Sequence, residues 1–297
     1  MDLGIVILNY NTRELLRDCL RSLEKTRGIE MEVMVVDNAS RDGSVEMVRA
    51  EFATTRVIAN ETNGGYAQGN NRALREFLAR PTPPRALMLL NPDTVVPPDS
   101  LRLLIEFLDA HPDAGIVGPK LLLRDGSLDL ACRRSFPTPE ISFYRMIGLS
   151  KLFPKSKRFG RYNLTYLDEN ETARVDSVVG AAMLMRTEAL KQAGLLDENF
   201  FMYGEDLDLA LRIKQKGWNA YYYPHAKIMH YKRESSKQSK KAQIEFYRAM
   251  YIFYEKHYRK TTPFYLDWMV MGGIALKGGL ALAPEIFRAR EWKGTSV

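Results

Sequence analysis

Short apolar runs alternate with longer helical patterns along the first 120 residues. The apolar runs predict strands, and the segments between them repeat apolar residues at helical spacing. The predicted strands are 3–8, 31–36, 57–59 and 86–90, and the predicted helices are 13–23, 44–52, 66–78 and 101–108. Strand and helix alternation at this spacing is typical of βαβ units on a parallel sheet. The pattern therefore predicts an α/β fold in which residues 1 to about 120 form a nucleotide-binding half.

The strand predicted at 86–90 is the centre of this half. Its five apolar residues show no polar alternation, so both faces should be buried, and it stops abruptly at Asn91-Pro92-Asp93. Asp93 then lies past the carboxyl end of a strand, at the edge where open α/β sheets bind ligands, and is a candidate metal or phosphate-site ligand. The alternative is a simple turn before a helix capped by Asp99 or Ser100.

A second carboxylate, Asp37, follows the strand predicted at 31–36. At a strand end it could accept the N3 proton of a pyrimidine ring. Alternatively, Asp37 forms an Asx-turn while Asp42 and Ser44 cap the next helix. The two interpretations are compatible, because capping does not use Asp37.

A glycine-rich loop spans residues 60–71. Its consecutive glycines, Gly64 and Gly65, allow close backbone approach, and N–H groups at the start of the following helix could face a diphosphate. The turn Asn9-Tyr10-Asn11-Thr12 after the first strand carries no Gly-x-Gly-x-x-Gly motif, and the chain has no Gly-Lys-Ser/Thr loop. Dinucleotide-binding Rossmann proteins and P-loop enzymes are therefore disfavoured.

The second half of the chain is less regular. Residues 115–133 predict a strand, a turn at Asp125-Gly126 and a second short strand, and 133–174 predict a long, partly ordered insertion. A buried strand is predicted over 175–186, where Gly180-Ala181 leave room for a substrate or a neighbouring backbone. A strand at 219–223 and an aromatic-rich helix at 243–258 follow.

Acidic residues crowd a predicted helix start at Gly204-Glu205-Asp206-Leu207-Asp208. Acids in a first turn offset the helix dipole, and Asp208 with Arg212 makes an ordinary i, i+4 ion pair. These residues are therefore explained by helix stability as readily as by catalysis.

Four of these motifs occur together in a characteristic order. They are Asn9-Tyr10-Asn11, residues 36–44, residues 63–71 and Asn91-Pro92-Asp93. In this order, over about residues 3–236, the sequence resembles family 2 inverting glycosyltransferases, and in particular the rhamnosyltransferase-like branch that builds bacterial cell-surface polysaccharide. The resemblance implies a GT-A fold at 1–236, divided into a nucleotide-sugar half (1–120) and an acceptor half (121–236), with a C-terminal helical extension at 237–297.

The resemblance also implies catalytic and metal-binding roles. Asp206 would be the catalytic base, and Glu205 would orient it or bind the acceptor. Asp93 and His230 would bind a divalent cation, Mn²⁺ or Mg²⁺. Asn91 replaces the first carboxylate of the family's Asp-x-Asp motif, so the oxygen shell is sparse and the metal affinity should be modest.

Donor-binding residues follow from the same resemblance. Asp37 would contact the base, and the loop 63–71 would lie along the donor. The residues implied in nucleotide-sugar binding are Asn9, Asn11, Asp37, Asn63, Gly64, Gly65, Asn70 and Asn91. Arg233, Ser235 and Ser236 could add phosphate contacts.

These residues predict a metal-dependent inverting glycosyltransferase. The base takes the acceptor hydroxyl proton, and the cation stabilises the departing nucleoside diphosphate. Branch likeness favours dTDP-L-rhamnose as donor, with UDP- and GDP-sugars open, and a saccharide or polyprenyl-linked acceptor. A nucleotidyltransferase that makes nucleotide sugars is one alternative, but it should carry a Gly-rich, basic loop where this chain has residues 9–13. A non-catalytic nucleotide-sugar-binding scaffold is the other, and the intact Glu205-Asp206 pair disfavours it.

Charge and cysteine content refine the setting. The formal net charge is +7, with basic clusters at 151–161 and 227–260 that favour nucleotide phosphates or acidic lipid head groups. Nucleic acid is not an expected partner, because no recognised nucleic-acid module accompanies these clusters. Nothing demands a disulfide between Cys19 and Cys132, and no signal peptide is visible, so a cytoplasmic location is predicted.

The C-terminal segment 268–284 is apolar apart from Lys277. It is a little short for a transmembrane helix and is followed by Arg288, Arg290 and Lys293. It predicts an interfacial or dimer-forming helix pair, with its basic residues facing the inner surface of the cell membrane. The alternative is a terminal helix packed on the core of the enzyme itself.

Overall fold

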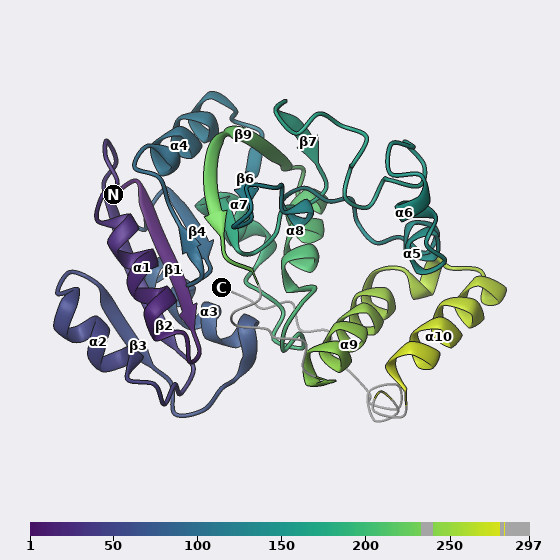
Figure 1. Ribbon diagram of the computed structural model, residues 1–297, viewed down its shortest axis with the longest axis horizontal. Helices are drawn as coiled ribbons and strands as arrows, with labels where there is room; N and C mark the ends of the chain where they lie inside the picture. Colours follow the sequence, from purple (N-terminus) through teal and green to yellow (C-terminus); the bar gives the residue numbers. More distant parts are fainter. Residues whose placement is uncertain (233–239, 280–281, 283–297) are drawn as a thin grey trace.

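The computed structural model describes residues 1–232, 240–279 and 282, and these residues form a nine-stranded sheet with helices packed around it (Figure 1). The strand order is β3-β2-β1-β4-β8-β6-β9-β5, and β7 pairs with β9 beside this path. The predicted phosphate contacts Arg233, Ser235 and Ser236 lie outside the described residues, as do Arg288, Arg290 and Lys293.

Parallel strands build the first half of the sheet, as the alternating pattern predicts. The strands are β1 (Leu3–Asn9), β2 (Met31–Asp37), β3 (Arg56–Ala59) and β4 (Ala86–Leu90). The helices between and after them are α1 (Arg13–Leu23), α2 (Ser44–Glu51), α3 (Gly65–Leu78) and α4 (Ser100–Ala110). Every residue of β4 is buried, which confirms a strand covered on both faces.

Strands of mixed direction complete the sheet on the other side of β4. They are β5 (Thr94–Val95), β6 (Ala114–Leu122), β7 (Ala173–Val175), β8 (Ala182–Arg186) and β9 (Asn219–His230). Strand β8 runs antiparallel to both β4 and β6, whereas β6 runs parallel to β9. The α/β fold is therefore confirmed, and both predicted halves of the chain contribute strands to one sheet.

Two sequence-based predictions about this side are wrong, and a third strand is confirmed but is longer than predicted. The strand predicted over 175–186 is interrupted, because Ser177 leaves the sheet to bridge Arg134 and residues 176–181 cross between β7 and β8. The second short strand in 115–133 is only a single bridge between Leu122 and Leu128, followed by a 3₁₀ turn. The strand predicted at 219–223 continues to His230, because it pairs along the whole of β6.

The start of α4 is held differently from the prediction, whereas the two cysteines remain free thiols. Neither Asp99 nor Ser100 caps α4 through its side chain, and Ser100 Oγ instead donates to the carbonyl of Lys227, 2.6 Å away. Cys19 and Cys132 are buried free thiols, as predicted. Burial raises the pKa of Cys19 to about 12, so this thiol is inert at neutral pH.

The remaining helices lie at one end of the molecule or beneath the sheet (Figure 1). They are α5 (Pro139–Met146), α6 (Leu149–Leu152), α7 (Thr187–Ala193), α8 (Glu205–Gln215), α9 (Lys240–His257) and α10 (Phe264–Gly278). The predicted pair of Asp208 and Arg212 is present at 2.8 Å, and Asp208 also lies 2.7 Å from Lys256 Nζ and from His257 Nε2. This cluster joins α9 to α8.

Most of the described part of the C-terminal apolar segment belongs to helix α10. Helix α10 begins at Phe264 and ends at Gly278, where Gly279 adopts a φ of +65°. One face packs beside α9, and the opposite face is exposed. Within the described part of the chain, no helix has the length and apolarity needed to cross a membrane.

Candidate active site

A cleft of about 2390 Å³ opens where several strands end. Its lining includes Leu8 at the end of β1, Asn38 after β2, Asp93 after β4 and His230 at the end of β9. The opposite wall carries residues 179–181, which precede β8, together with the start of α8. This position, outside the carboxyl ends of parallel strands, is the usual ligand site of an open α/β sheet.

Sheet pairing brings Asp93 and His230 together, although 137 positions in the sequence separate them. Strands β5 and β9 pair antiparallel with Thr94 opposite His230, so the residue before Thr94 lies beside the end of β9. His230 Nε2 is 3.4 Å from Asp93 Oδ1, and both side chains are buried. The two predicted metal ligands therefore face one another in the cleft.

Asp129 holds the other side of His230. The turn at Gly126, with φ of +79°, reverses the chain after β6 and carries Asp129 back to the site. Asp129 Oδ2 lies 3.0 Å from His230 Nδ1, and Lys232 Nζ donates to Asp129 Oδ1 at 2.7 Å. Burial by itself would lower the pKa of His230, but the hydrogen bonds to Asp129 and Asp93 outweigh it and raise that pKa to about 9.

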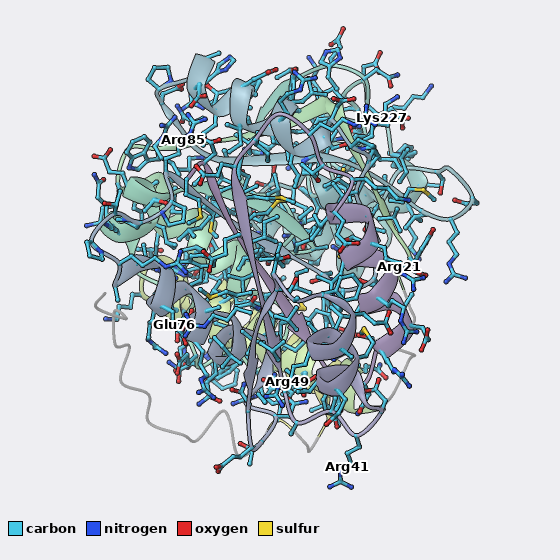
Figure 2. All side chains as sticks on the ribbon, turned by 90° about the vertical axis from the view of Figure 1, so that its left-hand side faces the viewer. Arg21, Arg41, Arg49, Glu76, Arg85 and Lys227 are labelled. Carbon is cyan, nitrogen blue, oxygen red and sulfur yellow. The ribbon has the colours of Figure 1, made fainter. Side chains whose placement is uncertain are left out.

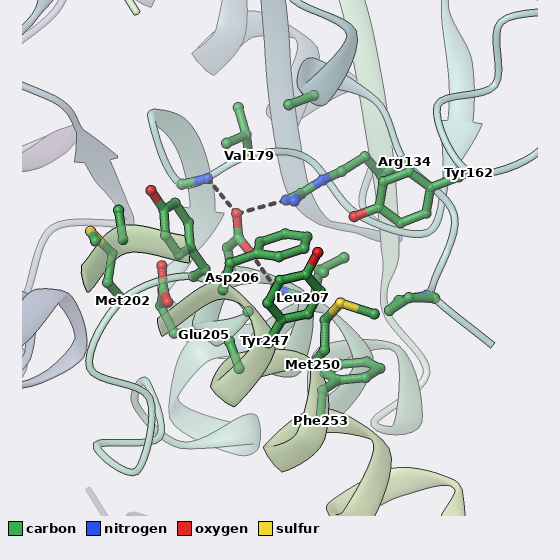
Figure 3. Close-up of a pocket in the computed structure, with 18 of the residues that line it drawn as sticks. Arg134, Tyr162, Val179, Met202, Glu205, Asp206, Leu207, Tyr247, Met250 and Phe253 are labelled. Atoms are coloured by element: carbon green, nitrogen blue, oxygen red, sulfur yellow. Dashed lines mark hydrogen bonds and ion pairs between the residues drawn. The ribbon is translucent and has the colours of Figure 1, made fainter. Parts of the chain in front are cut away.

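Asp206 sits in the first turn of α8, where the helix dipole favours negative charge. Its Oδ2 accepts from Arg134 Nη2 at 2.6 Å and from the Gly180 amide at 3.0 Å, and its Oδ1 accepts from the Leu207 amide at 2.7 Å. Figure 3 shows these three bonds converging on the carboxylate. A guanidinium and two amides hold this carboxylate in one orientation.

The neighbouring Glu205 lies in a different environment. It is buried, and its Oε2 has no hydrogen-bond partner. Burial and the charge of Asp206 raise the pKa of Glu205 well above the usual range, so it is protonated more readily than an ordinary glutamate. Two adjacent carboxyl groups in such different environments can serve different roles, one as base and one as hydrogen-bond donor.

The local backbone explains how α8 presents these acids. Tyr203 and Gly204 both adopt positive φ, 71° and 81°, which turns the chain sharply into the helix. Gly180, opposite, lacks a side chain where an added Cβ would lie 3.0 Å from Tyr66 Oη and 3.6 Å from Asp206 Cβ. Gly180 therefore leaves room for the side chains of Tyr66 and Asp206, at a position where the sequence predicted room for a substrate or a neighbouring backbone.

Several predicted donor-binding residues hold the loops beneath the cleft. Asn9 Nδ2 donates to Asp37 Oδ2 at 2.8 Å, and the Ser40 amide donates to Asp37 Oδ1 at 2.8 Å. Asn11, with φ of 53°, accepts from the Arg41 amide at 2.8 Å. Asp42 Oδ1 accepts from the Ser44 amide at 3.1 Å, so the start of α2 is held by Asp42 rather than by a Ser44 side-chain cap.

The glycine-rich loop is fixed against the loop before α8. Gly65 has φ of +87°, and a Cβ there would collide with the carbonyl oxygen of Phe201. The Gly65 amide donates to Asn63 Oδ1 at 3.0 Å, and the Tyr66 amide donates to Phe201 O at 2.6 Å. The first two amides of α3 are therefore already hydrogen-bonded within the protein. The sequence pattern predicted that amides at this helix start could face a diphosphate, and these two are not free to do so.

Only some of the predicted donor residues line the cleft. Asn63, Gly65 and Asn91 do. Asn70 is buried in α3 and donates to the Tyr66 carbonyl at 2.9 Å. Among the described residues that form the cleft wall, Asn9, Asn11, Asp37, Gly64 and Asn70 do not occur.

Comparison with known proteins identifies the family. A family model described as "Glycosyltransferase like family 2" matches residues 2–247. The chain belongs to this family. An N-acetylglucosaminyl-diphospho-decaprenol L-rhamnosyltransferase of Mycobacterium tuberculosis is 26% identical over 98% of this chain and 96% of its own length. The rhamnosyltransferase WbbL of Escherichia coli is 29% identical over 56% of this chain and 61% of its own length.

Solved structures agree with this assignment at the level of the fold. The Staphylococcus aureus TarS 1–349 complex with UDP superposes with a TM-score of 0.61 at 16% identity, covering 96% of this chain and 78% of that chain. The Pyrobaculum calidifontis mannosyltransferase PcManGT, in complex with GDP-Man and Mn²⁺, gives 0.59 at 16% identity, covering 97% and 76%. The predicted recognition as a rhamnosyltransferase-like family 2 glycosyltransferase is confirmed, and the nucleotidyltransferase and scaffold alternatives are set aside.

This glycosyltransferase offers few protein ligands to a divalent cation in the cleft. Asp93 Oδ1 is buried in the cleft and lies 3.4 Å from His230 Nε2, which leaves this weakly held carboxylate oxygen available to a cation. In the described part of the chain, no group of three or more His, Cys, Asp or Glu side chains forms a metal cage. A cation here would therefore take most of its ligands from a bound diphosphate, and His230 would have to lose its proton to join them.

Sequence reasoning missed Arg134 and Asp129. Arg134 lies in the irregular segment, 72 positions before Asp206, and no local pattern distinguishes it from Arg133 beside it. Asp129 follows the predicted turn at Asp125-Gly126, but it lies 101 positions before His230, so the sequence does not reveal their contact. The Asp125-Gly126 turn was the only signal that could have suggested a return of the chain toward the site.

Proposed function

We propose that this glycosyltransferase is a metal-dependent inverting rhamnosyltransferase that uses dTDP-L-rhamnose. The observation that carries the proposal is the cleft itself, in which Asp206, held by Arg134, shares one space with Asp93 and His230. Both rhamnosyltransferase relatives support the choice of sugar. The GT-A neighbours were solved with UDP and with GDP-Man, which keeps UDP- and GDP-sugars as the alternative donors.

Asp206 acts as the base in this proposal. The acceptor hydroxyl attacks the anomeric carbon of the donor in line with the leaving diphosphate, forming the new C–O bond as the old one breaks. The hydroxyl proton passes to the free lone pair of Asp206 Oδ1, because Oδ2 is already occupied by Arg134 and Gly180. Glu205, in its protonated form, donates a hydrogen bond that orients the acceptor.

A divalent cation, Mn²⁺ or Mg²⁺, would be held by Asp93 and His230 and would neutralise negative charge on the diphosphate. Residues 1–120 form the donor half of the proposed site and residues 121–236 the acceptor half, with 237–297 as an extension. The proposed donor contacts are Asn63, Gly65 and Asn91 on the cleft wall, with Asn9, Asn11, Asp37, Gly64 and Asn70 shaping the loops around them.

The proposed acceptor is a polyprenyl-linked saccharide for cell-surface polysaccharide. The name of the Mycobacterium tuberculosis relative specifies a diphospho-decaprenol acceptor, and alignment over 98% of this chain supports extending that class of substrate. Such an acceptor would place the enzyme at the inner face of the cell membrane as a peripheral protein. Formation of a homodimer is a further part of the proposal.

Isothermal titration with dTDP-, UDP- and GDP-sugars, with and without Mn²⁺ or Mg²⁺, tests the donor site. We expect metal-dependent binding of dTDP-L-rhamnose that Asp93→Ala weakens about tenfold or more. Asp99→Ala, which removes an exposed carboxylate, is the matched control and should bind normally. Failure of every sugar to bind, with or without metal, would contradict the proposal.

Asp206→Asn tests the base separately. Asn is isosteric with Asp and cannot accept the proton, so donor binding should survive while transfer falls about 100-fold or more. Unchanged transfer by this variant would show that another group is the base.

A further inference from the structure

The outward face of α10 is apolar along its whole length. Its exposed large side chains recur at helical spacing and form one stripe. They are Phe264, Tyr265, Trp268, Met269 and Leu276, and Trp268 and Leu276 are 76% and 85% exposed. On the opposite side, Ile274 is buried, and Asp267 accepts from Tyr254 at 2.8 Å. The stripe is therefore separate from the face that holds α10 in place.

A second exposed apolar group lies beside this stripe. It consists of Phe143, Met146, Ile147, Leu152 and Phe153, from the ends of α5 and α6. Helix α10 contacts α5, where a Cβ added to Gly273 would lie 3.0 Å from Met146 Sδ. Figure 1 shows α5, α6 and α10 at the same end of the molecule. We call these ten side chains the α5–α10 face, and exposed apolar surface of this extent marks an interaction site.

Lysines flank the α5–α10 face. Lys151, Lys155 and Lys157 are exposed, and Lys151 and Lys155 lie on either side of the apolar Leu152 and Phe153 in the sequence. For these three lysines, the described residues provide no ion pair. Lysine is depleted in protein–protein interfaces, whereas lysine stems beside aromatic and aliphatic side chains suit the boundary between lipid and water.

The cleft connects the α5–α10 face with the catalytic residues. The same cavity is lined by Asp93 and Asp206 at one end and by Met146, Met269 and Leu276 at the other. A lipid-linked acceptor lying in a membrane below this face could therefore reach Asp206 without leaving the bilayer. This last step alone rests on the proposed function.

We propose that the α5–α10 face docks the enzyme on an anionic membrane surface, with the mouth of the cleft toward the bilayer. The apolar side chains enter the head-group region, and the three lysines contact anionic lipid head groups. Helix α10 lies in the plane of the surface, consistent with its 15-residue length.

Co-sedimentation of the full chain with vesicles tests this proposal. We expect binding to vesicles of phosphatidylcholine and phosphatidylglycerol that declines with added salt and is weak on phosphatidylcholine alone. Phe264→Gln/Trp268→Gln should weaken binding about tenfold or more, because both side chains are exposed and neither belongs to the cleft lining. Lys151→Ser/Lys155→Ser/Lys157→Ser should lose about tenfold on anionic vesicles only.

The matched control removes the same charge from the opposite end of the molecule. Arg21→Ser/Lys25→Ser/Arg49→Ser deletes three exposed cations, from α1, the turn after it and α2, and Figure 2 shows Arg21 and Arg49 on this end of the molecule. Its vesicle binding should stay within about twofold of the parent. Equal binding by the parent and the Phe264/Trp268 variant would overturn the proposal. So would a dimer that is dispersed by that variant while the parent binds no vesicles, since the face would then join two copies.

Two further measurements distinguish membrane docking from the proposed function. They are donor titration and transfer to a short-chain, water-soluble acceptor. Both readouts should be unchanged in the Phe264/Trp268 variant, while transfer to a vesicle-embedded acceptor falls with vesicle binding. A parent protein that docks as expected but binds no nucleotide sugar would contradict the proposed function and leave the membrane face standing.

Discussion

Arg134 Nη2 lies 2.6 Å from Asp206 Oδ2, and both side chains are buried at the back of the cleft. Arg134 also donates to the Val178 carbonyl at 2.8 Å, so its guanidinium is fixed to the segment that precedes β8. Burial alone would lower the pKa of Arg134, but the charge of Asp206 outweighs it and raises that pKa further. Asp206 therefore has a cationic partner throughout the physiological pH range.

Replacing Arg134 should impair catalysis more than donor binding. In Arg134→Gln, Asp206 loses its charged partner and its orientation, so we expect kcat to fall about 100-fold and the free energy of unfolding to fall by about 3 kcal/mol. Arg134→Lys keeps the charge and should recover part of both losses.

Arg133→Gln is the matched control for this prediction. Arg133 is also buried, but it donates to the carbonyls of Leu167 and Asp168, away from Asp206. Stability should fall while kcat stays within about threefold of the parent. Similar kcat losses in both arginine variants would point to a general folding defect instead of a role for the Arg134 contact.

Glu205→Gln should affect turnover much less than Asp206→Asn. Since Glu205 is protonated more readily and lacks a partner at Oε2, Gln reproduces its neutral form and removes repulsion from Asp206. We expect kcat of Glu205→Gln within about tenfold of the parent, with thermal stability equal or higher, and a loss of about 100-fold in Asp206→Asn. Steady-state kinetics with denaturation curves will decide, and the reverse ranking would transfer the role of base to Glu205.

Asp129→Asn should weaken donor binding in the presence of metal. Asp129 fixes His230 from the side opposite Asp93 and also binds Lys232, so its loss frees two side chains at the donor end of the cleft. An outer partner of this kind contributes about tenfold to affinity, measured by titration with the nucleotide sugar and Mn²⁺. Asp125→Asn, in the exposed turn of the same loop, should bind normally. Equal losses in the two variants would indicate a distorted loop.

Asp208 should make stability depend on pH in the acid range. Burial would raise its pKa, but the hydrogen bond to His257 and the charges of Arg212 and Lys256 outweigh burial and hold the pKa below its ordinary value of 3.8. A depressed folded-state pKa means that the stabilisation is complete above the unfolded value and is lost as pH falls through the folded value.

Denaturant unfolding at several pH values tests this dependence. Asp208→Asn should lower the free energy of unfolding by about 3 kcal/mol at pH 7, and the difference from the parent should shrink as pH falls below about 4. Asp99→Asn, at an exposed position, should follow the parent at every pH. A constant difference between parent and Asp208→Asn would contradict this account.

Local patterns were sufficient for the first half of the fold. The run at 86–90 predicted a buried strand, and β4 is buried at every residue. Asp93 was correctly placed past a strand end, because a run of apolar residues that stops at a proline specifies its own boundary. The crossing segment before β8 was mistaken for strand, since buried loop and buried strand have the same apolar composition.

Motif order, together with position at a strand end or a helix start, singled out Asp93, Glu205 and Asp206 as candidate site residues. The structure places all three in one cleft. Their partners emerge only from the tertiary structure: Arg134 for Asp206, Asp129 for His230, and α5 for α10. Such contacts join residues far apart in the chain and depend on strand register, which local periodicity does not encode even where a turn such as that at Gly126 is recognisable.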